Sequence, residues 1–544
     1  MFTLAPYLGH ETFLDQRRGV FATVGYLLRN VFGNNTHTDN IALTGANSVG
    51  VDVSGQILTL AGIISGTGAM TKVGPGTIAL NGDNTFSGGT SINTGGVISG
   101  HNNAFGTGVI SIASGACAFS STVDGLVIAN NITIGPNVLT IGGDKAITFS
   151  GTFSFYSNPA PAINLLNSAL TTFTGPLVLS TTNGNTNTIL SGTGNVTISG
   201  NMSDGFRSMG FRWSSTGLLI LSGTNSYTGE TRTTAGTLRL VGAASLSSGT
   251  SGLTFSGTAP ILQLYGDTGQ TFDVSKLISF TNTTSATTID LLGAGSNQTH
   301  TIGNISASPQ SIASSLIITG SNGYGLTMGN LTFIGGNSTT RTLTNNAEGL
   351  WNIGAISDDA GVFNITLAFS GAGAIRVTGA ISDSTPGAGL MHVTKGGTNT
   401  LTLEGTNTYD GTTAINGGTL QGTGSIASNT TVANTAGCTI RGGTGAGNAG
   451  TFTITGTLTF AGANARLAVG IGSTSTCSLV AVSGAVALGG MTVNFDTGYD
   501  LDPGTYTLIT GGSMSGTVVA GIAPTGRSWT SLGIVGNNLV AVLA

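Results

Sequence analysis

The stretch TIALNGDNTFSGGTSINTGGV, residues 77–97, decides the fold, because its pattern returns twice in the chain. It returns as LLILSGTNSYTGETRTTAGTL at residues 218–238 and as TLTLEGTNTYDGTTAINGGTL at residues 400–420. Each copy is an apolar run ending in Leu-x-Gly, then Asn, with an aromatic residue at +2, Gly at +4 and +11, Thr at +6 and an aliphatic residue at +13. The Asn, aromatic and +4 Gly residues are Asn84, Phe86 and Gly88; Asn225, Tyr227 and Gly229; and Asn407, Tyr409 and Gly411. Internal repeats of this kind predict a stack of similar structural units.

A second element, Gly-x-[Ile/Met]-Ser, lies upstream of each copy. It occurs at residues 62–65, 200–203 and 379–382, and once more at 354–357. The distance from its Ile or Met to the Asn of the following copy grows along the chain, from 20 residues to 23 and then 26, counted as 84 − 64, 225 − 202 and 407 − 381. The strands match while the turns between them lengthen, which a solenoid tolerates because insertions loop outward. We therefore predict an all-β, single-stranded parallel β-solenoid, with glycines at corners and ladders of Asn and Thr along the stack.

The composition agrees with a solenoid and excludes several function classes. The chain has 544 residues, of which 90 are glycine and only 7% are charged, against about 25% charged residues in a typical soluble protein. Coils of ~20–25 residues predict roughly 20–25 coils and a length on the order of 100 Å. The net charge is −5 and no basic patch is present, so we expect no nucleic-acid partner. No run of about 18 apolar residues is present, so we expect no direct membrane insertion.

The first residues differ from the repeats. Apolar residues recur there at intervals of three and four, which predicts a helical face. They are Val20, Phe21, Val24, Leu27, Leu28, Val31 and Phe32. This predicts a short N-terminal helix in residues 1–39, acting as a cap, as a docking segment or as a face for self-association. The β-solenoid is expected over residues 40–480, and its C-terminal end or cap over residues 481–544.

The repeats resemble a known family. Residues 72–96 and 395–420 look like the autotransporter-associated β-strand repeat, also called the passenger-associated transport repeat, and residues 214–238 resemble it less well because they lack the lysine. Two segments at the C-terminal end of the chain, residues 504–512 and 538–544, are also similar to passenger ends in that family. The resemblance implies a right-handed β-helix displayed on a bacterial surface, often adhesive. The sequence shows neither the family's signal peptide nor its C-terminal membrane part, and it has an acidic residue, Glu11, near its start.

The chain has few residues that could act in catalysis, bind a metal ion or contact a ligand. Asp204, Asp358, Asp359 and Asp383 follow the Gly-x-[Ile/Met]-Ser element and would line one edge if the coils stack in register, but Asp after Ser more often caps a turn. The five histidines are isolated, and Cys438 and Cys477 are either bonded across stacked coils or free and buried. Trp213, Trp351, Trp529 and Tyr26 are more often core residues than sugar-stacking platforms. We therefore predict no catalytic residue, cofactor or metal.

Three functions fit these observations. The first is an extracellular attachment rod on a phage virion, such as a tail fibre, spike or head decoration, which the missing export signal and the N-terminal anchor favour. The second is a bacterial passenger-like adhesin or matrix protein, which the repeat family favours. The third is a polysaccharide-degrading enzyme, against which the scarcity of carboxylates argues. Expected partners are other virion or cell-surface proteins through the N-terminal segment and host glycans or proteins, with specificity in the longer turns at 204–216 and 383–392.

Overall fold

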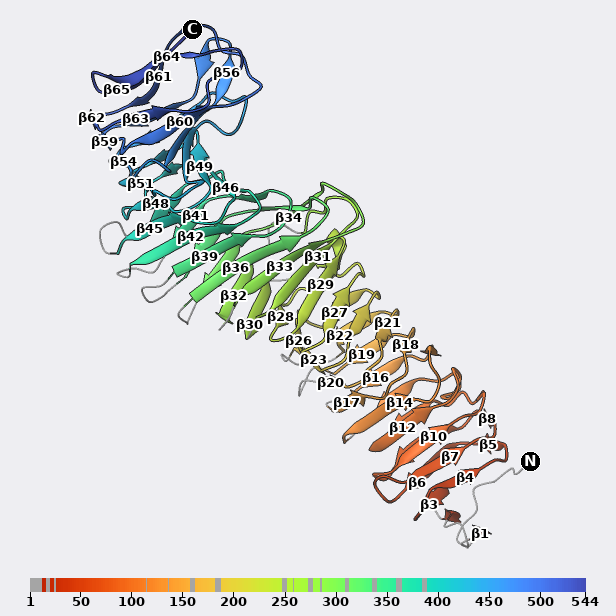
Figure 1. Ribbon diagram of the computed structural model, residues 1–544. Coiled ribbons are helices and arrows are strands. Elements are labelled where there is room, and N and C mark those ends of the chain that lie inside the picture. Colours follow the sequence, from red (N-terminus) through yellow and green to blue (C-terminus); the bar gives the residue numbers. More distant parts are fainter. Residues whose placement is uncertain are drawn as a thin grey trace. The chain divides into compact units, whose positions relative to one another are not determined.

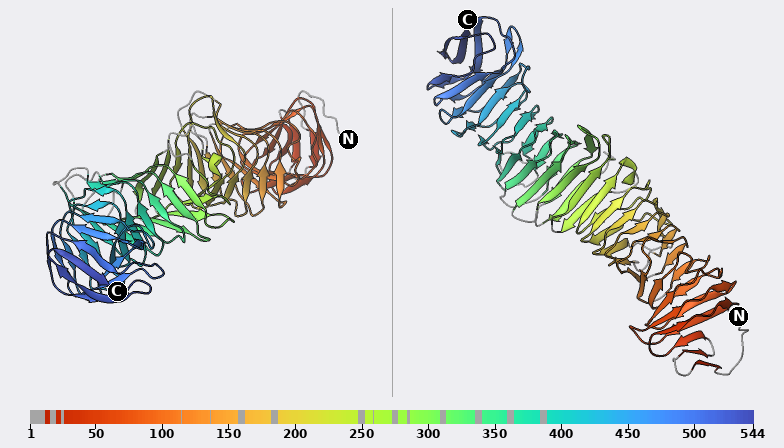
Figure 2. Two further views of the ribbon diagram at one scale, coloured as in Figure 1. Left: turned by 90° about the horizontal axis from the view of Figure 1, so that it is seen from above. Right: turned by 45° about the vertical axis from the view of Figure 1, so that its right-hand side comes forward.

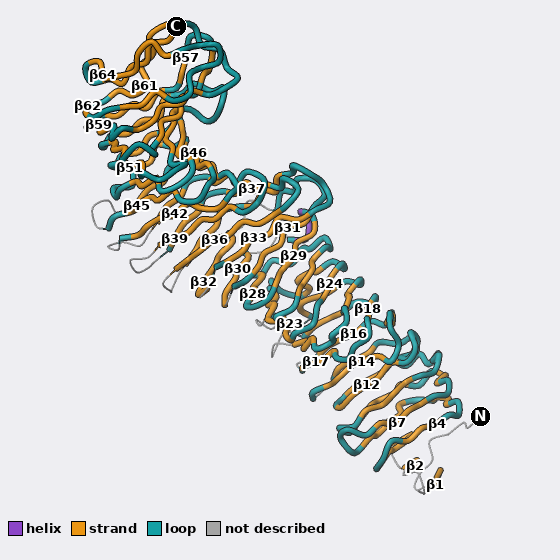
Figure 3. Tube along the Cα trace, in the orientation of Figure 1, coloured by secondary structure: helices purple, strands orange, loops and turns teal. Residues whose placement is uncertain are grey.

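The computed structural model describes residues 12–544 except 16–19, 24–25, 114, 136, 157–161, 182–186, 247–251, 258, 273–276, 284–285, 309–312, 335–339, 359–363 and 384–388. The described residues form an all-β parallel solenoid of about 19 turns. This confirms the predicted fold class, with somewhat fewer and longer turns than expected. The chain divides into two compact units, Met1–Thr254 and Phe255–Ala544. Within each unit, strands of successive coils lie side by side and are joined by loops (Figures 1, 2 and 3).

The core of the first unit is a column of aliphatic and aromatic side chains that repeats once per coil. Five parallel strands show it: β7 (Ile57–Leu60), β10 (Thr77–Leu80), β12 (Gly95–Ser99), β14 (Cys117–Ser121) and β17 (Val138–Ile141). Their register aligns Leu58, Ile78, Val97, Phe119 and Ile141, all of which are buried. Most of the residues next to them along each strand are at least partly exposed, as the period of two requires. Each such side chain contributes about 1.5–3 kcal/mol by leaving water.

The second unit repeats this arrangement in a ten-stranded sheet. Its strands include β37 (Gly325–Met328), β40 (Trp351–Ile353), β43 (Ile375–Val377), β46 (Thr400–Leu403), β49 (Thr419–Gly422), β52 (Thr439–Gly442), β55 (Arg466–Val469) and β60 (Met491–Phe495). The buried column runs through Leu326, Trp351, Ile375, Leu401, Leu420, Ile440, Leu467 and Val493. Trp213 and Trp351 are fully buried, and Trp529 is half-buried, so the tryptophan side chains mainly pack against other residues of the protein.

The predicted N-terminal helix is wrong. The segment instead forms β1 (Thr12–Asp15), β2 (Val20–Thr23) and β3 (Tyr26–Asn30), which pair antiparallel with one another. β3 then pairs in parallel with β6 (Ala46–Val51), so Leu28 lies opposite Val49. Two features explain the strands: glycines and β-branched residues in the segment disfavour a helix, and the first coil offers β3 a strand to pair with. Among the described residues the helical structure is a single 3-10 turn, Ala243–Ser245.

The last strands of the second unit change direction. β61 (Gly504–Thr510) and β64 (Trp529–Val535) both pair antiparallel with β65 (Asn538–Leu543). These strands lie within the predicted C-terminal region 481–544, where this antiparallel pairing stands beside parallel pairs such as β60 with β63 (Val518–Ala520). A search of the described residues for a helix long and apolar enough to cross a membrane found none.

Candidate functional site

The asparagine of each repeat bridges three successive coils. The Oδ1 atom of Asn84 accepts a hydrogen bond from the Ile64 amide (2.7 Å), and its Nδ2 atom donates to the Ala104 carbonyl (2.7 Å). Asn225 joins the Met202 amide (2.9 Å) to the Ser245 carbonyl (2.6 Å) in the same way.

Asn407 repeats the bridge in the second unit, between the Ile381 amide (2.8 Å) and the Ser425 carbonyl (2.9 Å). The amides belong to the Ile or Met of the Gly-x-[Ile/Met]-Ser element, so this contact links the two sequence motifs. All three asparagines are buried, where a polar group without a partner is costly.

The aromatic residue of each repeat is buried beside the threonine at +6. The Tyr227 hydroxyl lies 2.5 Å from Thr231 Oγ1, and the Tyr409 hydroxyl lies 2.7 Å from Thr413 Oγ1. Burial raises the pKa of Tyr409 to about 12 and that of Tyr227 further. The first repeat has Phe86 in this place, and the buried Thr90 hydroxyl there has no hydrogen-bond partner. The tyrosine hydroxyl therefore satisfies a buried threonine that phenylalanine leaves unsatisfied.

Replacing Tyr227 with phenylalanine should reproduce this defect. We expect Tyr227→Phe to lower the free energy of unfolding by about 1 kcal/mol, because Thr231 Oγ1 loses its hydroxyl partner. Urea unfolding followed by circular dichroism measures the change. Tyr156→Phe is the control, because Tyr156 is exposed, and it should change stability by only a few tenths of a kcal/mol. Equal effects of the two substitutions would contradict the assigned role.

The two glycines of the repeat both lie against the preceding coil, but they differ in backbone conformation. Those at +4 sit where one coil touches the next: a Cβ atom on Gly88 would lie 2.4 Å from the Gly68 carbonyl carbon, and one on Gly411 would lie 2.3 Å from the Met391 carbonyl oxygen. Those at +11 have positive φ, 81° at Gly95 and 61° at Gly418. Only the second kind is needed for its backbone conformation, as predicted for the corners.

Two of the repeats contain a buried lysine, which belongs to the family resemblance but for which sequence reasoning predicted no role. The Nζ atom of Lys72 donates to the carbonyls of Val73 (3.0 Å), Gly74 (2.7 Å) and Thr94 (3.2 Å). Lys395 donates to the three corresponding carbonyls, those of Gly396, Gly397 and Gly417. Three acceptors match the three protons of an ammonium group. Burial lowers the pKa of each lysine to about 8. The signal in the sequence was a lysine 12 residues before Asn84 and Asn407; Trp213 takes this place before Asn225.

Two of the aspartates after the Gly-x-[Ile/Met]-Ser element accept hydrogen bonds from backbone amides in loops. Asp204 Oδ1 accepts hydrogen bonds from the amides of Thr228 (2.8 Å) and Met209 (2.9 Å), and Asp383 Oδ2 accepts one from the Asp410 amide (3.0 Å). Asp358 and Asp383 are neighbours on the paired strands β41 (Ile356–Asp358) and β44 (Ile381–Asp383), as expected for coils in register. Asp359 lies outside the described residues.

Asp383 and Asp410 form a carboxyl pair. Burial, and then the hydrogen bond and charge of Asp410, raise the pKa of Asp383 to about 7. Because the folded state holds this proton to a higher pH than the unfolded chain, the group's contribution to the free energy of unfolding falls as the pH rises from about 4 to about 7.

We expect Asp383→Asn to remove this part of the pH dependence. The wild type should lose more stability than the variant between pH 5 and pH 7, as measured by urea midpoints at each pH. Asp144→Asn, at an exposed aspartate, is the control and should follow the wild type. Parallel curves for the wild type and Asp383→Asn would contradict the assignment.

The remaining predicted residues are not brought together into a site. The side chains of Val20, Phe21, Val24 and Leu27 lie outside what the structure describes, Leu28 is buried, Val31 is half-buried and Phe32 is 54% exposed. Cys117, Cys438 and Cys477 are not disulfide-bonded. Within the described residues, no group of three His, Cys, Asp or Glu side chains is placed to hold a metal ion.

Comparisons with known proteins agree with the repeat geometry. The model of the family "Passenger-associated-transport-repeat" matches residues 70–105, 214–240 and 393–421, the segments that contain the three bridging asparagines. The chain is also similar to the "Adhesin BmaC autotransporter" of Brucella suis biovar 1 (strain 1330), with 30% identity over 142 residues, which is 23% of this chain and 4% of that protein. The chain thus spans a small part of this relative's length. No solved structure matches. At three places in its solenoid, the chain carries the passenger-associated transport repeat.

Proposed function

We propose that this protein is an extracellular attachment protein of the autotransporter-passenger type, in which the solenoid is a non-enzymatic stalk that presents binding surfaces. The observation that carries the proposal is the coil-bridging repeat, because its three copies coincide with the segments matched by the passenger repeat family. The similarity to a protein named as an adhesin supports the same function. The right-handed sense of the coil, which the repeat family implies, belongs to this proposal.

The proposed location is the bacterial surface rather than a virion. The sequence alone had favoured the virion. One argument for the virion was a helical N-terminal anchor, and strands take the place of that helix. The comparisons support the bacterial alternative. Docking of the N-terminal strands to another surface protein, with Phe32 exposed beside them, remains part of the proposal.

An attachment assay tests the proposal. Beads coated with the full chain should bind host cells or extracellular matrix more strongly than beads coated with the Gly88→Ala/Gly411→Ala variant. In that variant a Cβ atom would clash with the backbone of the adjacent coil at two places. A soluble excess of the folded chain should compete with the coated beads. Equal retention of both kinds of bead would overturn the attachment function.

A further inference from the structure

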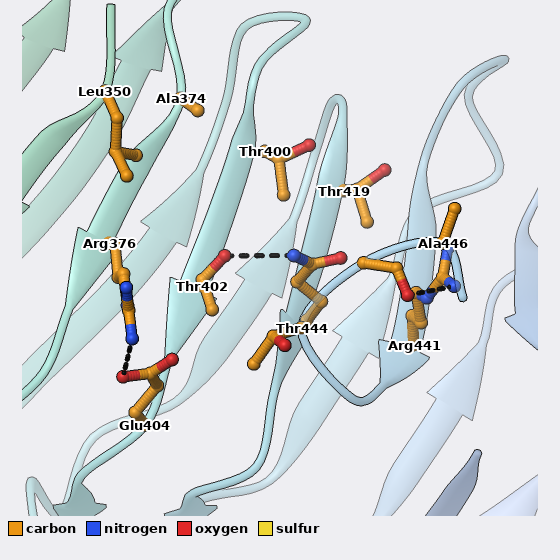
Figure 4. A pocket seen from close by; sticks show the side chains of 12 residues that line it. Leu350, Ala374, Arg376, Thr400, Thr402, Glu404, Thr419, Arg441, Thr444 and Ala446 are labelled. Carbon is orange, nitrogen blue, oxygen red and sulfur yellow. Dashed lines mark hydrogen bonds and ion pairs between the residues drawn. The ribbon is translucent and has the colours of Figure 1, made fainter. Parts of the chain in front are cut away.

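A polar groove lies on the outward face of the ten-stranded sheet in the unit Phe255–Ala544 (Figure 4). Its volume is about 480 Å³, within the range of small-ligand sites. Side chains of β43, β46, β49 and β52 form its floor, and the loop containing Thr444, Gly445 and Ala446 forms one wall. The third repeat supplies Thr400, Thr402 and Thr419 to this groove, but the bridging asparagines of the repeats face the core and do not line it.

The floor of the groove consists of two rows of side chains set by the register of the strands. One row runs through Arg376, Thr402, Gln421 and Arg441, each paired with the next across adjacent strands. The other row contains Thr400 and Thr419, which are also directly paired. Parallel strands space such side chains about 4.8 Å apart. Gln421 Nε2 donates to Thr402 Oγ1 (3.0 Å), which fixes both side chains.

Arg441 fixes the wall of the groove. Its Nη2 atom donates to the Gly445 carbonyl (2.6 Å), and its Nη1 atom donates to Asp496 Oδ1 (3.0 Å). Arg441 also forms an ion pair with Asp496, and both side chains are about nine-tenths buried. A two-point contact between a guanidinium and a carboxylate is geometrically specific. The loop is therefore held over the sheet face.

The charges in the groove are compensated. Arg376 pairs with Glu404 at 2.8 Å, and Arg441 pairs with Asp496. The lining side chains that remain are chiefly threonines and Gln421, with Leu350, Ala374 and Ala446 at the margins. These side chains carry hydroxyl groups, one amide and the threonine methyl groups. Such a lining suits a ligand that carries many hydroxyls and small C–H patches and has no net charge.

We propose that this groove binds a short neutral oligosaccharide, an inference that rests on the proposed attachment function. Sugar rings would lie across the strands, with hydroxyls toward Thr400 and Thr419, which are half-buried. An extended peptide fits less well, because peptides usually join a sheet at an open edge, and these strands are already paired on both sides. An anionic ligand fits less well, because each arginine already has a carboxylate partner.

Titration calorimetry of the full chain with a panel of trisaccharides tests the proposal. The probes are maltotriose, cellotriose, mannotriose and triacetylchitotriose, with a sulfated trisaccharide as the charged comparison. We expect at least one neutral probe to bind, and Thr400→Val/Thr419→Val to raise its Kd about tenfold, because two hydroxyls are lost while their methyl groups remain. Thr133→Val, at an outward threonine of β16 (Ile132–Ile134), is the matched control and should leave the Kd unchanged.

Three results would overturn the proposal: no neutral probe binds at millimolar concentration, the double variant binds as well as the wild type, or the sulfated probe alone binds and salt abolishes its binding. The attachment assay separates this inference from the proposed function. Adhesion without binding of any neutral probe would overturn only the proposal that the groove binds an oligosaccharide. Binding of a neutral probe that the double variant weakens, without adhesion, would overturn the attachment function alone.

Discussion

Replacing Gly88 with alanine is expected to lower the free energy of unfolding by about 3 kcal/mol or more. The new Cβ atom would lie 2.4–2.5 Å from backbone atoms of Gly68 and Ala69 in the adjacent coil. Backbone atoms cannot move aside as a side chain can, so the two coils must separate and their column of buried side chains must loosen. Gly229 and Gly411, the equivalent glycines, should respond in the same way.

Thermal and urea unfolding of Gly88→Ala measure this effect. Gly142→Ala is the matched control, since Gly142 lies in the same unit and a Cβ there would meet no atom within 4 Å. The control should change stability by less than about 1 kcal/mol. A Gly88→Ala protein as stable as the control would mean that the coils do not approach as closely as described.

Replacing Asn407 with alanine should cost about 2–4 kcal/mol. The substitution leaves the Ile381 amide and the Ser425 carbonyl without their partner, and it opens a small cavity at a position that is 2% exposed. Because each coil of a solenoid contacts mainly its neighbours, the loss should be local.

Hydrogen exchange measured by mass spectrometry should locate the loss from Asn407→Ala. Peptides containing Ile381 and Ser425 should exchange faster, while peptides from the unit Met1–Thr254 should be unchanged. Asn416→Ala, at an exposed asparagine of the same repeat, is the control. Protection that is unchanged near Ile381, or lost evenly along the chain, would contradict the bridging role.

The fold and the repeat contacts were largely predictable, because they depend on residues at fixed offsets. The pattern at Asn84, Asn225 and Asn407 predicted ladders between coils, and the bridges to the neighbouring coils are contacts of that kind. The roles of the glycines were only half predictable. A positive φ can be expected from a corner, whereas the close approach at Gly88 depends on another coil about 20 residues away.

Three features could not be derived from local pattern. The N-terminal apolar spacing fits a helix as well as strands over so short a segment, and the outcome depends on pairing of β3 with β6. Lys72 and Lys395 look like surface residues until their three carbonyl partners are placed around them. Binding specificity was expected in the turns at 204–216 and 383–392, whereas the groove joins side chains of successive coils, and its wall depends on an Arg441–Asp496 contact 55 residues apart.

Antibody labelling of intact cells from the native source tests the central claim most directly. Antibodies raised against the purified chain should label intact and permeabilised cells to the same extent, because the solenoid is proposed to lie outside the cell. Labelling that appears only after permeabilisation, or that follows DNA-filled particles on a density gradient, would contradict a bacterial surface attachment protein.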